Sequence, residues 1–278
     1  MKQSSYFISH GAPDLVVKPI AAHQFLRQLG EKLRADNSLK GIVMVSAHWQ
    51  QHQRREHHHQ LGSQNNRVLL ERNDRPGIQY DFGGFGPELH QYQYDIHSHV
   101  DVRHAVIHSL EQGGWLVEQV DRPVDHGSWV PLAVLDKEAD IPVVNISLPA
   151  EETPQATLAL GKSLASLREQ GIAIIGSGAI THNLSILGRE GAEPPDWALD
   201  FAEGIRVLLN DGNIDAIAEL FDTAEFRFAH PTPEHFLPLL VAAGAGVNFE
   251  NGGGVINAEQ VHQSFSYQTI AMDAYRFG

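Results

Sequence analysis

Three short apolar segments, each followed closely by a histidine, constrain the fold of this chain more than any other feature. The segments are residues 6–9, 41–47 and 172–175, and the histidines after them are His10, His48 and His182. Each segment is too short for a typical helix, and residues 172–175 are rich in β-branched residues, which predicts buried strands of a parallel sheet. Ligands of open α/β sheets bind beyond the carboxyl ends of the strands, so the three histidines indicate a site at that edge.

The third segment is followed by Gly176, Ser177 and Gly178. Glycine allows a sharp turn or a close approach of another backbone, so we expect this stretch to end the strand. His182 then lies in the loop beyond it.

Helical patterns alternate with the strand-like segments through most of the 278 residues. Apolar residues recur at helical spacing in residues 19–34, 100–112, 154–170, 196–209 and 214–221. Neither an internal repeat nor a linker-like tract interrupts this order, which predicts a single domain spanning residues 1–278. The predicted fold class is α/β, with a central, mostly parallel (mixed) sheet flanked by helices. The alternating apolar residues of 263–272 predict a final antiparallel edge strand.

Composition excludes several classes of site and partner. Acidic residues outnumber basic ones by 34 to 20, giving a formal charge of −14, which disfavours a nucleic-acid partner. The chain has no cysteine, so any metal must be held by nitrogen and oxygen ligands. The sequence has neither an apolar run long enough for a membrane span nor a secretory signal at its start. We therefore expect a cytoplasmic protein without a membrane partner, and a homo-oligomer remains open.

Two further histidines stand in motifs of their own. Asp125-His126-Gly127 predicts a loop in which a carboxylate beside the imidazole orients it. Thr232 and Pro233 predict the cap and first position of a helix, which places His235 in its first turn. The positive end of that helix disfavours a charged imidazole, and a metal ligand must be neutral.

Histidine is abundant, with 17 copies, and many of them must lie on the surface. The run of residues 57–59 stands between charged and polar residues and predicts a solvated loop, with adventitious metal binding as the alternative.

Several imidazoles at one sheet edge, without thiols, indicate a mononuclear site for zinc or iron(II). The chain lacks the H-E-x-x-H, G-x-S-x-G, P-loop and G-x-G-x-x-G motifs. These residues alone leave two kinds of enzyme open: a zinc-dependent hydrolase and an iron oxygenase.

Six short motifs occur in the order of one known family. They are I-S-H-G-A-P (8–13), V-S-A-H-W (45–49), Y-D-F-G-G-F (80–85), D-H-G-S-W-V-P-L (125–132), G-S-G-A-I-T-H-N-L (176–184) and P-T-P-E-H-F-L-P-L-L (231–240). On these motifs the chain resembles the class III extradiol ring-cleavage dioxygenases of the LigB type, and most of all their 4,5-DOPA dioxygenase branch. The matches extend from residue 8 to about residue 245, nearly the whole chain.

The resemblance implies roles for the histidines. His10, His48 and His235 would be metal ligands, and His182 would be the acid–base residue, which this branch also counts as a fourth ligand. His126 would be a second catalytic histidine of the pocket. The position of His235 carries a glutamate in the larger relatives, so the resemblance leaves the site without a coordinating carboxylate. The implied cofactor is one divalent metal per chain, iron(II) for activity, which zinc(II) can replace.

The resemblance also implies the reaction. The chain would be an oxidoreductase that opens the aromatic ring of a catechol with O2, so its partners are a small aromatic diol and O2. Candidates for the pocket wall are Tyr80, Phe82, Phe85 and Trp129. Two alternatives stay open: a zinc-dependent hydrolase that uses the same pocket, and a non-catalytic metal-binding or interaction protein on the same fold.

Overall fold

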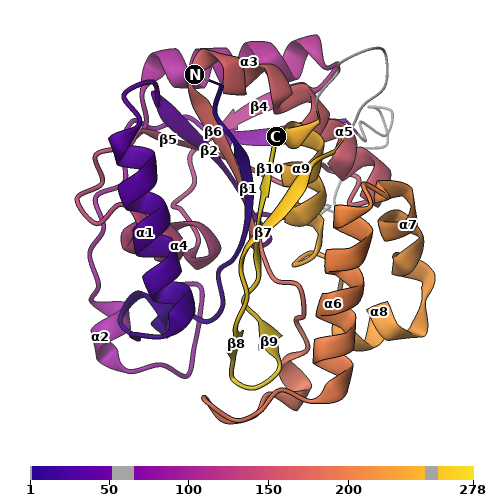
Figure 1. The fold of residues 1–278 in the computed structure, drawn as a ribbon. Coiled ribbons are helices and arrows are strands. Elements are labelled where there is room, and N and C mark those ends of the chain that lie inside the picture. The colour runs from indigo at the N-terminus through magenta and orange to yellow at the C-terminus, as the bar shows by residue number, and fades with distance from the viewer. Residues whose placement is uncertain (1, 52–65, 248–255) are drawn as a thin grey trace, which may run out of the picture.

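One mixed sheet organises the chain. The computed structural model describes residues 2–51, 66–247 and 256–278, and among them eight strands pair in the order β4-β3-β5-β2-β6-β1-β10-β7 (Figure 1). The strands are β1 (Ser5–Ser9), β2 (Gly41–Ser46), β3 (Arg67–Glu71), β4 (Leu116–Val120), β5 (Val143–Ile146), β6 (Ile172–Gly178), β7 (Ala258–His262) and β10 (Ala274–Phe277). The central strands β5, β2, β6 and β1 run parallel, whereas β3 and β10 run antiparallel to the neighbours that join them to this core. The predicted α/β class with a mostly parallel, mixed sheet is confirmed.

Helices cover both faces of the sheet. On one face lie α1 (Ala21–Ala35) and α4 (His126–Leu135), and on the other lie α3 (Val100–Gln112), α5 (Pro154–Leu164) and α9 (Leu237–Gly246). An outer group consists of α6 (Asp196–Asn210), α7 (Ile214–Glu219) and α8 (Ala224–Ala229), and α2 (Pro87–His90) is a single short turn. No helix of the described part of the chain is long and apolar enough to cross a membrane.

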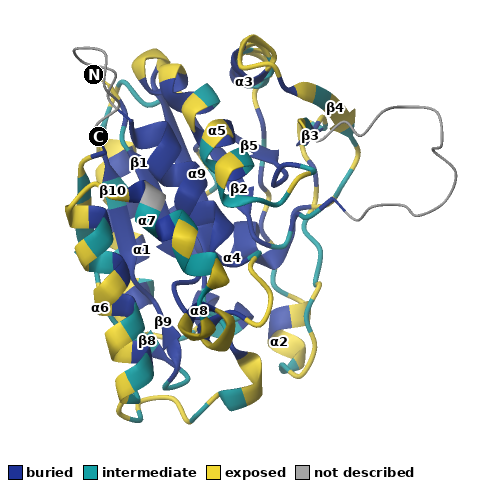
Figure 2. Cartoon of the chain, turned by 90° about the vertical axis from the view of Figure 1, so that its right-hand side faces the viewer, coloured by how far each residue is buried: buried dark blue, intermediate teal, exposed yellow. Residues whose placement is uncertain are grey.

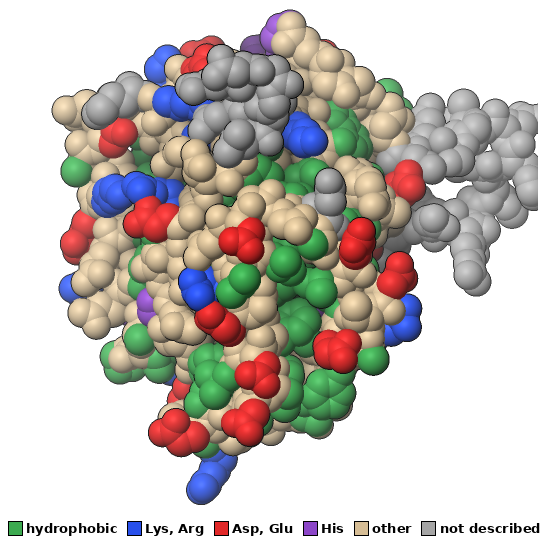
Figure 3. All heavy atoms as spheres, turned by 45° about the vertical axis from the view of Figure 1, so that its right-hand side comes forward, with side chains coloured by type: hydrophobic (Ala, Val, Ile, Leu, Met, Phe, Trp, Pro, Cys, Tyr) green, Lys and Arg blue, Asp and Glu red, His purple; other side chains and the backbone are tan. Residues whose placement is uncertain are grey.

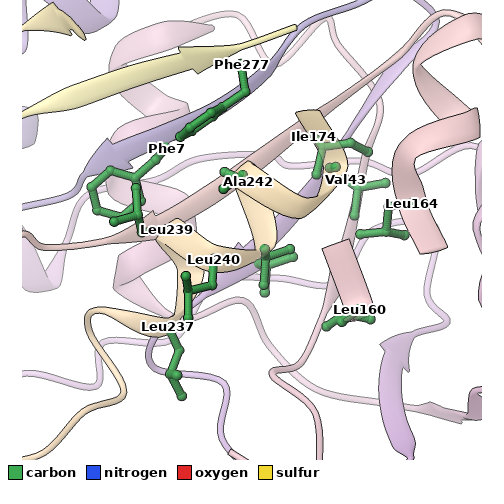
Figure 4. Close-up of a cluster of buried hydrophobic side chains, with 14 of the residues drawn as sticks. Phe7, Val43, Leu160, Leu164, Ile174, Leu237, Leu239, Leu240, Ala242 and Phe277 are labelled. Carbon is green, nitrogen blue, oxygen red and sulfur yellow. The ribbon is translucent and has the colours of Figure 1, made fainter. Parts of the chain in front are cut away.

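The central strands are apolar on both sides because each side faces a helical layer. In β2, Ile42 and Met44 belong to the cluster under α1 and α4, whereas Val43 and Val45 belong to the cluster under α3, α5 and α9. Figure 2 shows the central strands and α9 as buried, and Figure 4 shows the side chains of α9 packed against the strands and α5. The continuous apolar runs of the sequence therefore predicted these strands correctly.

Strand β6 corrects one expectation. It does not end before the glycines but continues through Gly178, pairing with both β1 and β2. A Cβ atom on Gly176 would lie 2.1 Å from the carbonyl oxygen of Pro238, and one on Gly178 would lie 2.1 Å from that of His235. The glycines allow a neighbouring backbone to approach the strand, and they do not break it.

The end of the chain corrects a second expectation. Residues 263–272 do not form an edge strand. They contain the small two-stranded sheet of β8 (Phe265–Ser266) and β9 (Ile270–Ala271), between which Tyr267 and Gln268 adopt positive φ angles of 48° and 66°. The chain turns back there, and the last strand, β10, lies inside the sheet between β1 and β7.

The predicted helices are confirmed, with small changes at their ends. Thr153 caps α5, since its side chain accepts a hydrogen bond from the backbone N–H of Ala156. The following residues Ala165–Gln170 continue as a 3-10 helix, which ends at Gly171 with a φ of 88°.

Candidate metal centre

Five histidines from distant parts of the chain meet beyond the carboxyl ends of β1, β2 and β6. They are His10 directly after β1, His48 in the turn after β2, His126 at the start of α4, His182 in the loop after β6, and His235 in the turn before α9. The parallel direction of β1, β2 and β6 brings their ends to one edge. The sequence predicted three of them, His10, His48 and His182, at that edge, and the structure brings all five together.

His48 lies at the centre of the group. Its Nε2 atom is 3.2 Å from Nε2 of His10 and 3.2 Å from Nε2 of His235. Two nitrogens bound to one tetrahedral zinc ion at about 2.0–2.1 Å lie about 3.3 Å apart. The spacing of these atoms therefore fits imidazole ligands of a single first-row metal ion.

Burial favours the neutral form of four of these imidazoles, the form that a metal ligand must have, and the four are His10, His48, His182 and His235. It lowers the pKa of His10 and of His235 well below the ordinary value, and the neighbouring histidines lower both further. Burial also lowers the pKa of His48 to about 3 and that of His182 to about 4. The sequence predicted that a helix end would keep His235 neutral, but burial is the main cause of its low pKa.

Three of the histidines have the Nδ1 atom fixed by a partner. Nδ1 of His10 lies 3.1 Å from the hydroxyl of Ser177, Nδ1 of His126 lies 2.9 Å from Oδ1 of Asp81, and Nδ1 of His235 lies 3.0 Å from Oε1 of Glu234. A carboxylate can only accept, so His126 and His235 donate from Nδ1. Such partners orient a histidine ring and leave Nε2 for the site.

The sequence predicted a loop around His126, but this residue is the first of α4. Its orienting carboxylate is also not the adjacent Asp125, whose Oδ1 accepts a hydrogen bond from Ser46, 2.6 Å away. Asp81 takes this role and accepts from both the ring and the backbone N–H of His126. Burial raises the pKa of Asp81, but the hydrogen bonds and charge interaction with His126 outweigh burial and hold that pKa below its ordinary value.

His235 is also not in the first turn of a helix. Helix α9 begins at Leu237, and Pro238, not Pro233, is the proline of its first turn. Thr232 does not cap the helix, because its hydroxyl donates to Oε1 of Glu234. The turn before α9 instead lies against β6, where the backbone N–H of Ala179 donates to the carbonyl of His235 at 2.8 Å.

A carboxylate lies closer to the site than the resemblance implied. The candidate ligand atoms of His182, Glu234 and His235 all lie within 4.8 Å of one another, as do those of His10, His48 and His126. The candidate metal ligands thus form two groups of three, and the contact between His48 and His235 joins the two groups. Glu234 supplies negative charge next to imidazoles that are neutral.

The predicted aromatic residues lie beside His126. The ring of Phe82 is 5.7 Å from that of His126 and 5.7 Å from that of Phe85, both edge to face. Tyr80 and Phe82 are half-buried and pack against Trp129. Trp129 is fully buried and donates from Nε1 to the carbonyl of Gln79, so it supports the other rings from behind.

The run of residues 57–59 lies outside the described residues. A cavity of about 750 Å³ is lined by residues of α6, α8 and the turn between α7 and α8, and by none of the five histidines. Figure 3 brings this side of the molecule forward and shows hydrophobic side chains gathered there among acidic ones.

Three functional candidates were not singled out from the sequence: Asp81, Ser177 and Glu234. Each lies inside a motif quoted above, so its residue type was visible. Glu234 directly precedes the histidine that it contacts, whereas nothing local showed which histidine Asp81 and Ser177 contact. Two of the contacts join residues far apart in the chain, and these pairings depend on the sheet and on the loop over it.

Comparisons with known proteins identify one matching family. Residues 5–278 match the family model described as the catalytic LigB subunit of aromatic ring-opening dioxygenase. The chain is 32% identical to a 4,5-DOPA dioxygenase extradiol of Beta vulgaris, over 99% of this chain and 96% of that protein. It is 28% identical to a protein of the same name from Escherichia coli K12, over 88% and 85% of the two chains.

One solved structure shows the same fold. It is the crystal structure of an uncharacterised protein of Escherichia coli K12, with a TM-score of 0.74 and 22% sequence identity over 99% of this chain and 100% of that chain.

Proposed function

The chain belongs to the family of catalytic LigB subunits of aromatic ring-opening dioxygenases, and on this premise we propose that it opens the ring of a catechol with O2. The observation that supports the proposal most directly is the contact of His48 Nε2 with Nε2 of both His10 and His235. Neutral, pre-oriented imidazole nitrogens at metal-ligand spacing fit the divalent metal that such chemistry needs.

His10, His48 and His235 would hold the metal, with His182 as a fourth ligand or as the acid–base residue beside it. A bound iron(II) ion supplies the redox link between an aromatic diol and O2. The remaining steps belong to side chains of this chain.

His182 would exchange the protons. Its imidazole is neutral in the folded chain, so its free ring nitrogen can accept a proton from a catechol hydroxyl and return it later. The backbone N–H of His182 donates to the carbonyl of Ala229 at 2.9 Å, which fixes the loop that carries the ring.

His126 would stabilise negative charge that develops on oxygen. Asp81 accepts from Nδ1, which fixes the orientation of the ring and leaves Nε2 for the site. The ring centroid of His126 lies 4.0 Å from that of His48, so Nε2 of His126 would act next to the proposed metal ligands.

In the proposed reaction, the ring carbon–carbon bond next to the diol breaks, and each of its two carbons receives one oxygen atom of O2. Plain catechol would give a hydroxymuconic semialdehyde, in which every atom of catechol and O2 is retained. Phe82 and Phe85, with Tyr80 and Trp129 behind them, would form the apolar wall against which the substrate ring packs.

Oxygen uptake tests the proposal. The purified chain would be reconstituted with iron(II) without oxygen and then supplied with L-DOPA, protocatechuate or catechol, with zinc-loaded protein and His182→Ala as controls. We expect oxygen uptake matched by a yellow ring-opened product, absent in both controls. Tight metal binding without oxygen uptake on any of the three diols would contradict the proposal and favour a hydrolase or a non-catalytic protein.

A further inference from the structure

The hydroxyl of Ser177 joins three elements of the site. Ser177 lies in β6 between Gly176 and Gly178 and is fully buried. Its Oγ atom is 2.5 Å from the carbonyl oxygen of Gly127 in α4 and 3.1 Å from Nδ1 of His10. One side chain thus connects β6, the start of α4 and the residue that follows β1.

The direction of these hydrogen bonds follows from Pro131. Proline has no backbone N–H, so Pro131 inside α4 cannot donate to the carbonyl four residues earlier, that of Gly127. The Ser177 hydroxyl donates its only hydrogen to this carbonyl. It can then only accept from His10, which must carry its hydrogen on Nδ1.

This arrangement leaves the Nε2 lone pair of His10 facing the site, 3.2 Å from Nε2 of His48. The opposite tautomer would place a hydrogen on Nε2 and block that nitrogen from a metal ion. The choice of tautomer at His10 therefore decides whether the residue can be a ligand.

We propose that Ser177 is a positioning residue that holds His10 in the metal-binding tautomer. The inference deepens the proposed function, on which it rests for the role of His10. The neutral hydroxyl of Ser177 would orient His10 in the way that the carboxylates of Asp81 and Glu234 orient His126 and His235.

The packing around Ser177 leaves its hydroxyl little freedom. A Cβ atom on Gly127 would lie 2.4 Å from Oγ of Ser46 and 2.8 Å from Cδ2 of His48, so only glycine brings this carbonyl so close. On the other face of β6, Gly178 lets the backbone of His235 approach the strand. The alternation of side chains along a strand thus directs Ser177 to His10 and Gly178 to His235.

The first experiment needs no variant. Long-range ¹H–¹⁵N NMR correlations of the metal-free protein report which ring nitrogen of His10 carries hydrogen. We expect Nδ1 to be protonated, and protonation at Nε2 would overturn the proposal.

The second experiment measures zinc(II) and cobalt(II) affinity by competition with a chelator. We expect Ser177→Ala to weaken binding about 10- to 100-fold, the usual effect of losing a partner behind a metal ligand. Ser5→Ala is the matched control. Ser5 lies in β1, the strand that His10 follows, and it is as buried as Ser177. Its hydroxyl donates to the carbonyl of Ala242 at 2.7 Å. This variant should lower thermal stability similarly without changing metal affinity.

Equal metal affinities of Ser177→Ala and the wild-type protein would overturn the proposal. Neither experiment measures ring opening, so a failure of the proposed dioxygenase activity stays distinguishable. If Ser177→Ala does not fold, the tautomer of the wild-type protein still decides the question.

Discussion

The imidazole ring of His182 lies flat against that of His235, with centroids 3.4 Å apart and planes inclined by 11°. His48, in contrast, meets its neighbours edge-on through Nε2, 3.2 Å from the nitrogens of His10 and His235. The two contacts differ in kind, because facing nitrogens suit a shared metal ion whereas a stacked ring is held mainly by packing. His48 and His182 should therefore respond differently to substitution.

Loss of a residue that only orients a metal ligand weakens metal binding about 10- to 100-fold. We expect His48→Ala to weaken metal binding more than that, because it removes the central nitrogen of the group. His182→Ala should weaken metal binding less and reduce turnover of the metal-loaded enzyme by about 10²- to 10⁴-fold, as the loss of an acid–base group does. Equilibrium dialysis and oxygen uptake measure the two effects. A larger loss of metal in His182→Ala than in His48→Ala would reverse the assignment.

Glu234 should act through His235. Glu234→Gln keeps the side-chain volume but removes the charge that faces Nδ1 of His235 at 3.0 Å, so metal affinity should fall about 10- to 100-fold. Glu259→Gln is the control, because Glu259 pairs with Arg276 on an exposed part of β7. Zinc competition assays measure both variants, and equal affinities would contradict the role of Glu234.

Asp81 should affect turnover more than metal binding. Asp81→Asn removes the carboxylate that accepts from Nδ1 of His126, so the ring loses the charged acceptor that fixes its orientation. We expect kcat to fall about 10- to 100-fold with nearly unchanged metal content. Asp95→Asn, at an exposed ion pair with Arg75, should leave both unchanged. Loss of metal from Asp81→Asn would instead place His126 among the ligands.

Gly178 should tolerate no side chain. In Gly178→Ala the new Cβ would lie 2.1 Å from the carbonyl oxygen of His235, so the turn before α9 must shift, at a cost of about 1–3 kcal/mol in the free energy of unfolding. Metal affinity should fall with it. Gly204→Ala is the control in α6, where a Cβ meets nothing within 4 Å, and should stabilise by about 0.5–1 kcal/mol. Urea unfolding measures both, and equal stabilities would refute the close approach.

Asp273 should make stability depend on pH. Burial raises its pKa from 3.8 to about 7, and its Oδ2 atom has no hydrogen-bond partner among the described residues. The folded state therefore binds a proton that the unfolded state loses, so stability falls as the pH rises from about 4 to 7, by about 4 kcal/mol in all.

Asp273→Asn cannot ionise and should lack this fall. The variant should be more stable than the wild-type protein at pH 8, and the difference should shrink towards pH 4. Thermal unfolding across this range measures the difference between the two proteins. Parallel pH profiles would show that Asp273 does not titrate in this way.

The sequence by itself determined the parallel core and the histidines at its edge. Strands buried on both faces need continuous apolar runs, and such runs are visible without knowledge of their neighbours. The sequence did not predict α4, because this helix is buried on all sides and so shows no amphipathic period. It did predict the helix α9, but with a start at Pro233 instead of Leu237. The glycines of β6 misled for a similar reason, since the backbone they accommodate belongs to residues 235–238.

Only the tertiary structure decided how the histidines are held. His10 meets Ser177 across 167 positions of sequence, and His126 meets Asp81 across 45. These hydrogen bonds determine which nitrogen of each ring faces the site. They depend on the order of the strands and on the carbonyl of Gly127, to which Pro131 cannot donate. A sequence shows which residues can bind a metal, whereas the orientation of their lone pairs is a property of contacts that only the folded chain makes.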